Sequence, residues 1–145
     1  MDLDCFADVL ATNVIGILAT CQAAFQVLNR PGAIVVNSSV NALRPEKNFA
    51  DYNASKAASL SIAQSLALDW ADERITVNAV CPGYFRSRMT ESYLDDPKTA
   101  GELLARIPQG RFGSADEIAS LVGFLMLGSV PFLAGAGIPI AGASH

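Results

Sequence analysis

Short apolar runs that alternate with helical patterns constrain the fold of this chain more than any other feature. Each run is brief and rich in branched side chains, which is typical of a strand buried on both faces of a parallel sheet. The runs are residues 33–36, 74–80 and 137–141, and the helical patterns are residues 3–28, 52–70 and 114–127. The order helix, strand, helix, strand, helix, strand predicts an α/β fold with a parallel sheet and flanking helices.

Local signals mark where these helices begin and end. Apolar side chains recur in 3–28 at about the helical period, and the turn sequence Asn29-Arg-Pro-Gly32 follows. Residues 52–70 are rich in helix formers and contain neither glycine nor proline. Ser114 and Glu117 match a capping box, which predicts the start of the last helix.

The predicted sheet has only three strands, which is few for strands as apolar as these, and no strand precedes the first helix. The pattern therefore indicates part of a larger sheet whose first strands are absent here. A chain of 145 residues fits one domain, so we expect residues 1–145 to form a single domain.

Residues 84–112 are long and irregular, with aromatic and apolar side chains among charges. Such a segment is typical of a lid or binding loop, and its content favours a hydrophobic substrate.

The composition excludes several kinds of partner. The net charge is −4 and no stretch gathers Lys and Arg into a stripe, so we expect no nucleic acid partner. The 3 cysteines form no C-x-x-C pair, which predicts neither a disulfide framework nor a zinc site and favours a reducing, cytoplasmic setting. The first residues are acidic, unlike a targeting segment. No Asp, Glu, Lys or Arg follows Glu117, but glycines and prolines break this stretch, so we expect no membrane partner.

A tyrosine and a lysine four residues apart form the sharpest local pattern. Their spacing places Tyr52 and Lys56 on one helix face, one turn apart. A free phenol has a pKa near ~10, whereas a neighbouring ammonium and a helix N-terminus favour phenolate, which makes Tyr52 a usable acid or base. Ser39 follows the strand at 33–36, where its hydroxyl could bond the same substrate oxygen. The alternatives are an exposed aromatic beside a solvated lysine, and a turn or capping serine.

Several motifs in register resemble those of the short-chain dehydrogenase/reductase family. They run nearly end to end, in the family's order and spacing, which is far more specific than any one motif. The motifs are Gly32-Ala-Ile-Val-Val-Asn-Ser-Ser39, Tyr52-Asn-Ala-Ser-Lys56, Ile75-Thr-Val-Asn-Ala-Val-Cys-Pro-Gly83, Gly110-Arg-Phe-Gly113 and Asp116-Glu-Ile-Ala119. The resemblance implies a Rossmann-type parallel sheet and reversible hydride transfer between NAD or NADP and a small-molecule alcohol or ketone.

The resemblance also assigns catalytic roles to matching residues. Tyr52 matches the family's general acid/base, and Lys56 matches the lysine that promotes its ionisation and bonds the nicotinamide ribose. Ser39 matches the serine that positions and polarises the substrate oxygen. Asn13 matches the helix asparagine that supports the lysine through water, although an asparagine within a helix also bonds locally or faces solvent.

Cofactor and subunit contacts are implied in the same way. Pro82 and Gly83 match the turn beside the nicotinamide, and Ser87 stands where the family commonly has a threonine that bonds the carboxamide. The family usually builds dimers and tetramers on the helices that match 3–28 and 52–70. A homo-oligomer is therefore implied.

The chain departs from the family pattern at both ends. It contains no glycine-rich turn between a strand and a helix, because Gly135-Ala-Gly137 precedes a strand. Ala141-Gly142-Ala143 stands where many members have Asp-Gly-Gly. We therefore interpret the chain as the C-terminal, catalytic portion of such an enzyme. The alternative is a truncated, catalytically silent chain that serves as an oligomerisation module.

Overall fold

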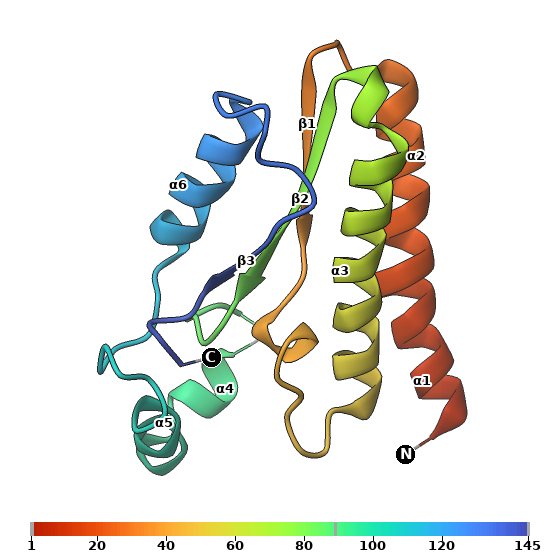
Figure 1. Ribbon diagram of the computed structural model, residues 1–145. Coiled ribbons are helices and arrows are strands. Elements are labelled where there is room, and N and C mark those ends of the chain that lie inside the picture. Colours follow the sequence, from red (N-terminus) through yellow and green to blue (C-terminus); the bar gives the residue numbers. More distant parts are fainter. Residues whose placement is uncertain (1, 89, 145) are drawn as a thin grey trace.

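A computed structural model of the chain describes residues 2–88 and 90–144. A π-helical turn joins the first two helices, and two 3-10 turns lie in the connections (Figure 1). The helices are α1 (Leu3–Leu10), α2 (Gly16–Val27), α3 (Ala50–Asp69), α4 (Glu91–Leu94), α5 (Pro97–Leu104) and α6 (Ala115–Met126). The strands are β1 (Gly32–Asn37), β2 (Ile75–Pro82) and β3 (Gly137–Ile140), and the turns are Ala11–Ile15, Val40–Ala42 and Ala71–Glu73.

The three strands form one parallel sheet in the order β1-β2-β3. Gly32 lies opposite Ile75, and Ala79 lies opposite Gly137. This register confirms the predicted α/β fold. Because the strands are parallel, their carboxyl ends meet at one edge of the sheet, where ligands bind in folds of this class.

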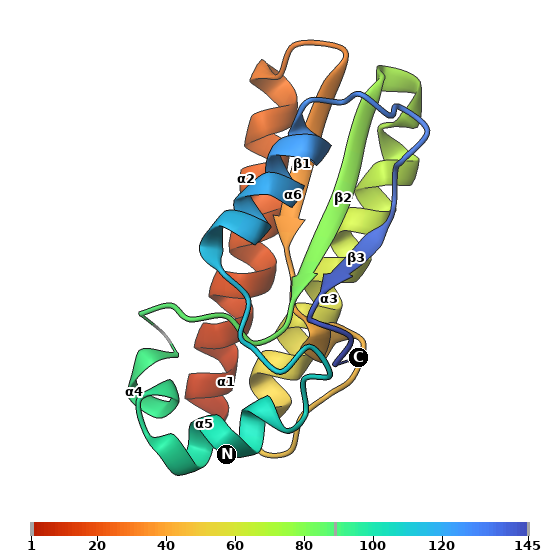
Figure 2. The same ribbon diagram turned by 90° about the vertical axis from the view of Figure 1, so that its left-hand side faces the viewer.

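Helices cover both faces of the sheet. One face is covered by α3 and by the continuous helix that α1, the π-helical turn and α2 form, and α6 lies on the other face (Figures 1 and 2). Small residues allow α3 to approach β2 closely: Ser55 and Ser59 are fully buried, and Ala63 is nearly so. They pack against a sheet interior that includes Val77 and Ala79. The first turn of α3 is thereby held at the carboxyl edge of the sheet.

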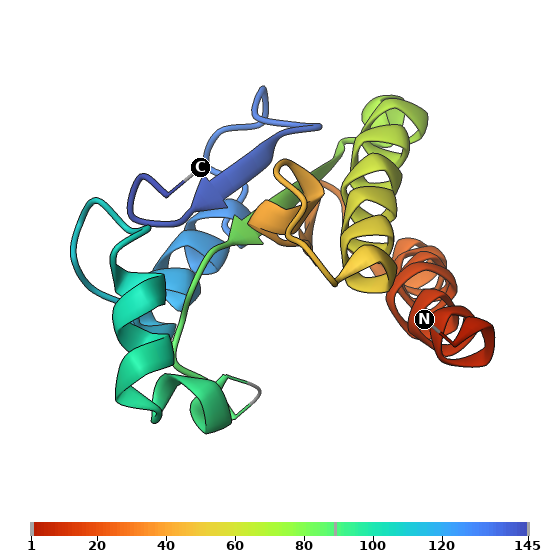
Figure 3. The ribbon, with the colours of Figure 1, turned by 90° about the horizontal axis from the view of Figure 1, so that it is seen from below.

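The structure differs from the sequence prediction in two places. Residues 3–28 were expected to form one regular helix, but Ala11–Ile15 are π-helical. Residues 84–112 were expected to be irregular, but they contain α4 and α5, and Asp96 caps α5 by accepting a hydrogen bond from the Thr99 N–H at 2.9 Å. Figure 3 shows these two helices on the side of the sheet away from α1.

The helix that runs from Leu3 to Val27 is long and apolar enough to cross a membrane, by length and composition alone. A helix that packs on a protein core passes the same test, and this one contributes Ile17, Leu18 and Phe25 to the cluster around β1 and α3. A groove of about 430 Å³ runs between this helix and β1, which is an edge strand of the sheet.

Candidate active site

Polar residues gather where β1 and β2 end. A cavity of about 380 Å³ opens there, which we call the strand-end cavity, and it contains five of the seven site residues predicted from the sequence. Its lining is Val35, Asn37, Ser38, Ser39, Tyr52, Val80, Pro82, Gly83, Phe85, Ser87, Thr90, Ile118 and Val122. The parallel sheet therefore brings these residues together from segments far apart in the sequence.

Lys56 lies beside Tyr52, one turn further along α3. Its Nζ is 5.6 Å from the centroid of the Tyr52 ring and donates a hydrogen bond to the Asn37 carbonyl at 3.0 Å. The side chain is 9% exposed. Burial lowers the pKa of the Lys56 ammonium, and negative charge on the nearby Cys81 thiol opposes that shift. The carbonyl at the end of β1 thus keeps the buried Lys56 amine near the Tyr52 ring.

Ser39 is buried at the start of the turn that follows β1. Its Oγ accepts a hydrogen bond from the Asn41 N–H at 3.2 Å and lies 3.4 Å from the Asn41 side-chain oxygen. The capping contact that the sequence left open is therefore present, while Ser39 also lines the strand-end cavity. Ser38 donates to the Lys56 carbonyl at 2.9 Å, which fixes the end of β1 against α3.

Asn13 lies in the π-helical turn. Its Nδ2 donates a hydrogen bond to the Ser55 Oγ at 3.1 Å, and that Oγ donates to the Tyr52 carbonyl at 2.8 Å. Asn13 therefore contacts the residue immediately before Lys56. Such turns are frequent at functional sites because they re-aim one residue of a helix. The periodicity of 3–28 carried no signal for this turn.

Asn13 also lines a second cavity of about 290 Å³ next to the first, which we call the loop cavity. Ser39, Tyr52 and Gly83 line both cavities, whereas Lys56 is in the lining of neither. The remaining lining of the loop cavity is Val9, Asn41, Glu46, Phe49 and Asp51.

The turn after β2 is fixed by contacts that require its glycine. The Gly83 N–H donates to the Ile140 carbonyl at 3.0 Å, and a Cβ at this position would lie 2.8 Å from the Cβ of Ala141. Ser87 is exposed, and its Oγ lies 3.2 Å from the Oγ1 of Thr90. Thr90, which the sequence analysis did not single out, is buried and lines the strand-end cavity.

Comparisons with known proteins agree with this arrangement. A family model described as enoyl-(acyl carrier protein) reductase matches residues 1–143. A 2-(R)-hydroxypropyl-CoM dehydrogenase from Xanthobacter autotrophicus is 38% identical over 140 residues, which cover 95% of this chain and 56% of that protein. A glucose 1-dehydrogenase from Gluconobacter oxydans is 35% identical over 136 residues, which cover 92% of this chain and 51% of that protein.

A solved structure of a putative 2-deoxy-d-gluconate 3-dehydrogenase from Agrobacterium tumefaciens, with bound NADP, has the same arrangement of elements. Its TM-score is 0.91 at 29% identity, and the match covers 99% of this chain and 59% of that one. The chain belongs to the short-chain dehydrogenase/reductase family. It spans about half the length of the curated relatives that it matches.

In this short-chain dehydrogenase/reductase the 84–112 segment buries three of its apolar side chains. Phe85, Leu94 and Ile107 are buried, with 8%, 3% and 4% of their surfaces exposed. Phe85 lines the strand-end cavity, whereas Leu94 and Ile107 line neither this cavity nor the loop cavity. The hydrophobic substrate that the composition of 84–112 favours stays a prediction.

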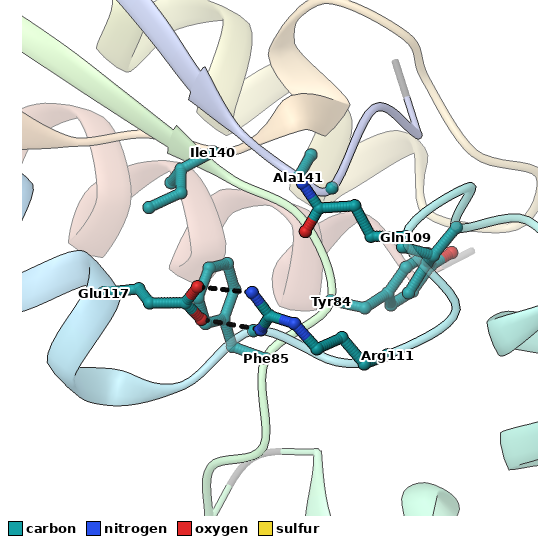
Figure 4. A pocket seen from close by; sticks show the side chains of 10 residues that line it. Tyr84, Phe85, Gln109, Arg111, Glu117, Ile140 and Ala141 are labelled. Carbon is teal, nitrogen blue, oxygen red and sulfur yellow. Dashed lines mark hydrogen bonds and ion pairs between the residues drawn. The ribbon is translucent and has the colours of Figure 1, made fainter.

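An ion pair fastens the far end of this segment to α6. Arg111 donates two hydrogen bonds to Glu117, at 2.9 and 2.7 Å, above a hollow of about 150 Å³ (Figure 4). Glu117 also accepts a hydrogen bond from the Ser114 N–H at 2.8 Å, which confirms the predicted helix start. The hydrogen bonds from Arg111 and Ser114 lower the pKa of Glu117 to about 2. The loop between α5 and α6 is therefore anchored at the point where α6 begins.

Gly113→Ala should destabilise this family member because Phe85 occupies the space that a side chain would need. A Cβ on Gly113 would lie 2.1 Å from the Phe85 Cε1, inside a parallel bridge between the two residues. Urea unfolding of the full-length protein should show a loss of about 1–3 kcal/mol, the usual range for overpacking. Gly123→Ala in α6, where nothing lies within 4 Å, should instead gain about 0.5–1 kcal/mol. Equal effects of the two changes would contradict the assigned packing.

Proposed function

We propose that the full-length protein containing this chain is an NAD(P)-dependent oxidoreductase that interconverts a small-molecule alcohol and its ketone or aldehyde. The observation that carries the proposal is the placement of Tyr52: the Lys56 amine lies 5.6 Å from the centroid of its ring, and Tyr52 lines two cavities together with Ser39. Relatives named as dehydrogenases and reductases support it. They give no support to the alternative of a catalytically silent oligomerisation module.

The strand-end cavity fits the nicotinamide end of a dinucleotide. Its volume of about 380 Å³ suits a nicotinamide with its ribose, and a whole dinucleotide would need more space. Pro82, Gly83 and Ser87 line it with polar backbone and a hydroxyl, while Ile118 and Val122 provide an apolar wall. Lys56, whose Nζ donates to the Asn37 carbonyl at the end of β1, would bond the ribose. When bound, the nicotinamide would supply the hydride acceptor or donor.

This chain's residues would hold the substrate oxygen and move its proton. In the oxidative direction Tyr52 would take the proton of the substrate hydroxyl as hydride leaves the carbinol carbon. The Ser39 hydroxyl would orient that oxygen, and the Lys56 ammonium would stabilise negative charge on the phenolic oxygen. In the reductive direction the same groups would return the proton. Asn13 would position the start of α3 through Ser55.

Titration of the full-length protein with NADH and with NADPH tests the proposal. We expect saturable binding of one or both, followed by the appearance of reduced cofactor when NAD or NADP is supplied with a secondary alcohol. The readouts are nicotinamide fluorescence for binding and absorbance for turnover. Failure of both cofactors to bind saturably would overturn the proposal.

A further inference from the structure

A carboxylate outside the Ser39, Tyr52 and Lys56 set is built into the loop cavity. Glu46 lines this cavity together with Ser39 and Tyr52, and its side chain is 31% exposed. It lies in the connection between β1 and α3, where the sequence analysis singled out no functional residue. Its surroundings hold both its backbone and its side chain in place.

Asn53, the residue immediately after Tyr52, fixes the backbone of Glu46. The Asn53 Nδ2 donates to the Glu46 carbonyl at 2.7 Å, and the Asn53 Oδ1 accepts from the Glu46 N–H at 3.4 Å. The same Oδ1 accepts a hydrogen bond from the Asn41 side chain at 2.8 Å. Because this clamp is made by a neighbour of Tyr52, Glu46 keeps a set position relative to the proposed catalytic tyrosine.

Two other segments fix the Glu46 side chain through one of its oxygens. The Tyr84 hydroxyl donates to Oε1, and the Arg106 NH1 lies 3.5 Å from the same atom. Burial and the adjacent carboxylate raise the pKa of Tyr84 to about 12, so its hydroxyl stays protonated and remains a donor. Among the groups that the structure describes, none donates a hydrogen bond to Oε2. One oxygen of an oriented carboxylate is therefore available to a ligand.

The charge of the loop cavity indicates which ligand this oxygen suits. Within the described part of the chain its lining includes two carboxylates, Glu46 and Asp51, and no lysine or arginine. Asp51 already accepts a hydrogen bond from the Tyr52 N–H at 2.8 Å. Arg106, which pairs with Glu46, has a side chain that is 64% exposed. An anionic substrate would thus meet like charge, whereas a neutral donor would meet a free acceptor.

We propose that Glu46 determines substrate specificity: its Oε2 accepts a hydrogen bond from a second hydroxyl beside the reacting carbinol, and its charge disfavours acidic substrates. The substrate class is then neutral vicinal diols and polyols or the corresponding hydroxy ketones. This inference rests on the proposed oxidoreductase function. The second hydroxyl of the substrate would donate a hydrogen bond to Oε2, which neither Tyr84 nor Arg106 contacts.

Three matched compounds test the inference in the full-length protein: cyclohexanol, its vicinal diol and the corresponding vicinal hydroxy acid. The wild type should give the highest kcat/KM with the diol and the lowest with the acid. Glu46→Leu removes the acceptor and should lower kcat/KM for the diol about tenfold, the usual scale for a hydrogen bond to a charged group, with cyclohexanol nearly unchanged. Glu46→Gln removes the charge and replaces one of the two acceptor oxygens by an NH2 donor, and it should raise kcat/KM for the acid about tenfold.

Controls separate specificity from folding. Glu102→Gln changes an exposed glutamate on α5 and should leave all three values unchanged. High salt should weaken the discrimination against the acid in the wild type but not in Glu46→Gln, because salt screens charge. Equal losses on the diol and on cyclohexanol would show a structural role only and overturn the inference. Turnover without preference would overturn it while leaving the proposed function intact, and absence of cofactor binding and turnover would remove both.

Discussion

Tyr52→Phe in the full-length protein should lower kcat roughly a thousandfold while cofactor affinity stays nearly constant, since proton transfer by a positioned side chain contributes on this scale. Phenylalanine keeps the ring that lies 5.6 Å from the Lys56 Nζ and loses only the hydroxyl. The packing of α3 on β2 does not use that hydroxyl. The measurements are kcat with a secondary alcohol and the dissociation constant of NADH or NADPH from fluorescence.

The pairing of these two measurements distinguishes the role of Tyr52 from a structural one. A misfolded variant would lose cofactor binding and turnover together. Retention of wild-type turnover would remove Tyr52 from the reaction. Weaker cofactor binding in proportion to the lost turnover would assign Tyr52 to binding only.

Lys56→Met should lower kcat/KM roughly a hundredfold, because an ammonium placed beside developing negative charge contributes on this scale. Methionine is of similar length and carries no charge, so it fills the space of a side chain that is 9% exposed. The hydrogen bond from Nζ to the Asn37 carbonyl would be lost. Lys98→Met, on exposed α5 surface, should retain wild-type kinetics.

The same variant should change how stability depends on pH. Burial lowers the pKa of Lys56 in the folded state below its ordinary value of 10.5. At a pH between the folded-state pKa and the unfolded-state pKa, the unfolded state therefore binds more protons than the folded state. The free energy of unfolding of the wild type should therefore gain a contribution from Lys56 as pH rises toward 10.5. Lys56→Met should lack this rise in denaturant titrations from neutral to alkaline pH. An identical pH profile in both proteins would contradict the assigned burial cost.

Local pattern was enough to predict the three strands, the principal helices and the juxtaposition of Tyr52 with Lys56. The apolar runs predicted three parallel strands, and Ser114 with Glu117 predicted the start of α6. The spacing of Tyr52 and Lys56 placed both on one face of α3. These predictions succeeded because each depends on neighbours within one or two turns of chain, where spacing alone determines which side chains meet.

Other features depended on contacts that no local pattern contains. The π-helical turn at Asn13 is matched to Ser55, which lies 42 residues further along the chain. The composition of 84–112 did not show that it contains α4 and α5, or that Leu94 and Ile107 are buried. A composition does not say on which side of a loop its side chains lie.

The sequence by itself determined an α/β chain of the short-chain dehydrogenase/reductase family and the residues proposed to carry its chemistry, because helix period, strand composition and motif spacing are local properties. Only the tertiary structure decided what surrounds those residues. Glu46 meets Tyr84 from 38 residues away and Arg106 from 60 residues away, across three separate connections at the carboxyl edge of the sheet. Such a meeting exists only once the parallel sheet has aligned the ends of its strands.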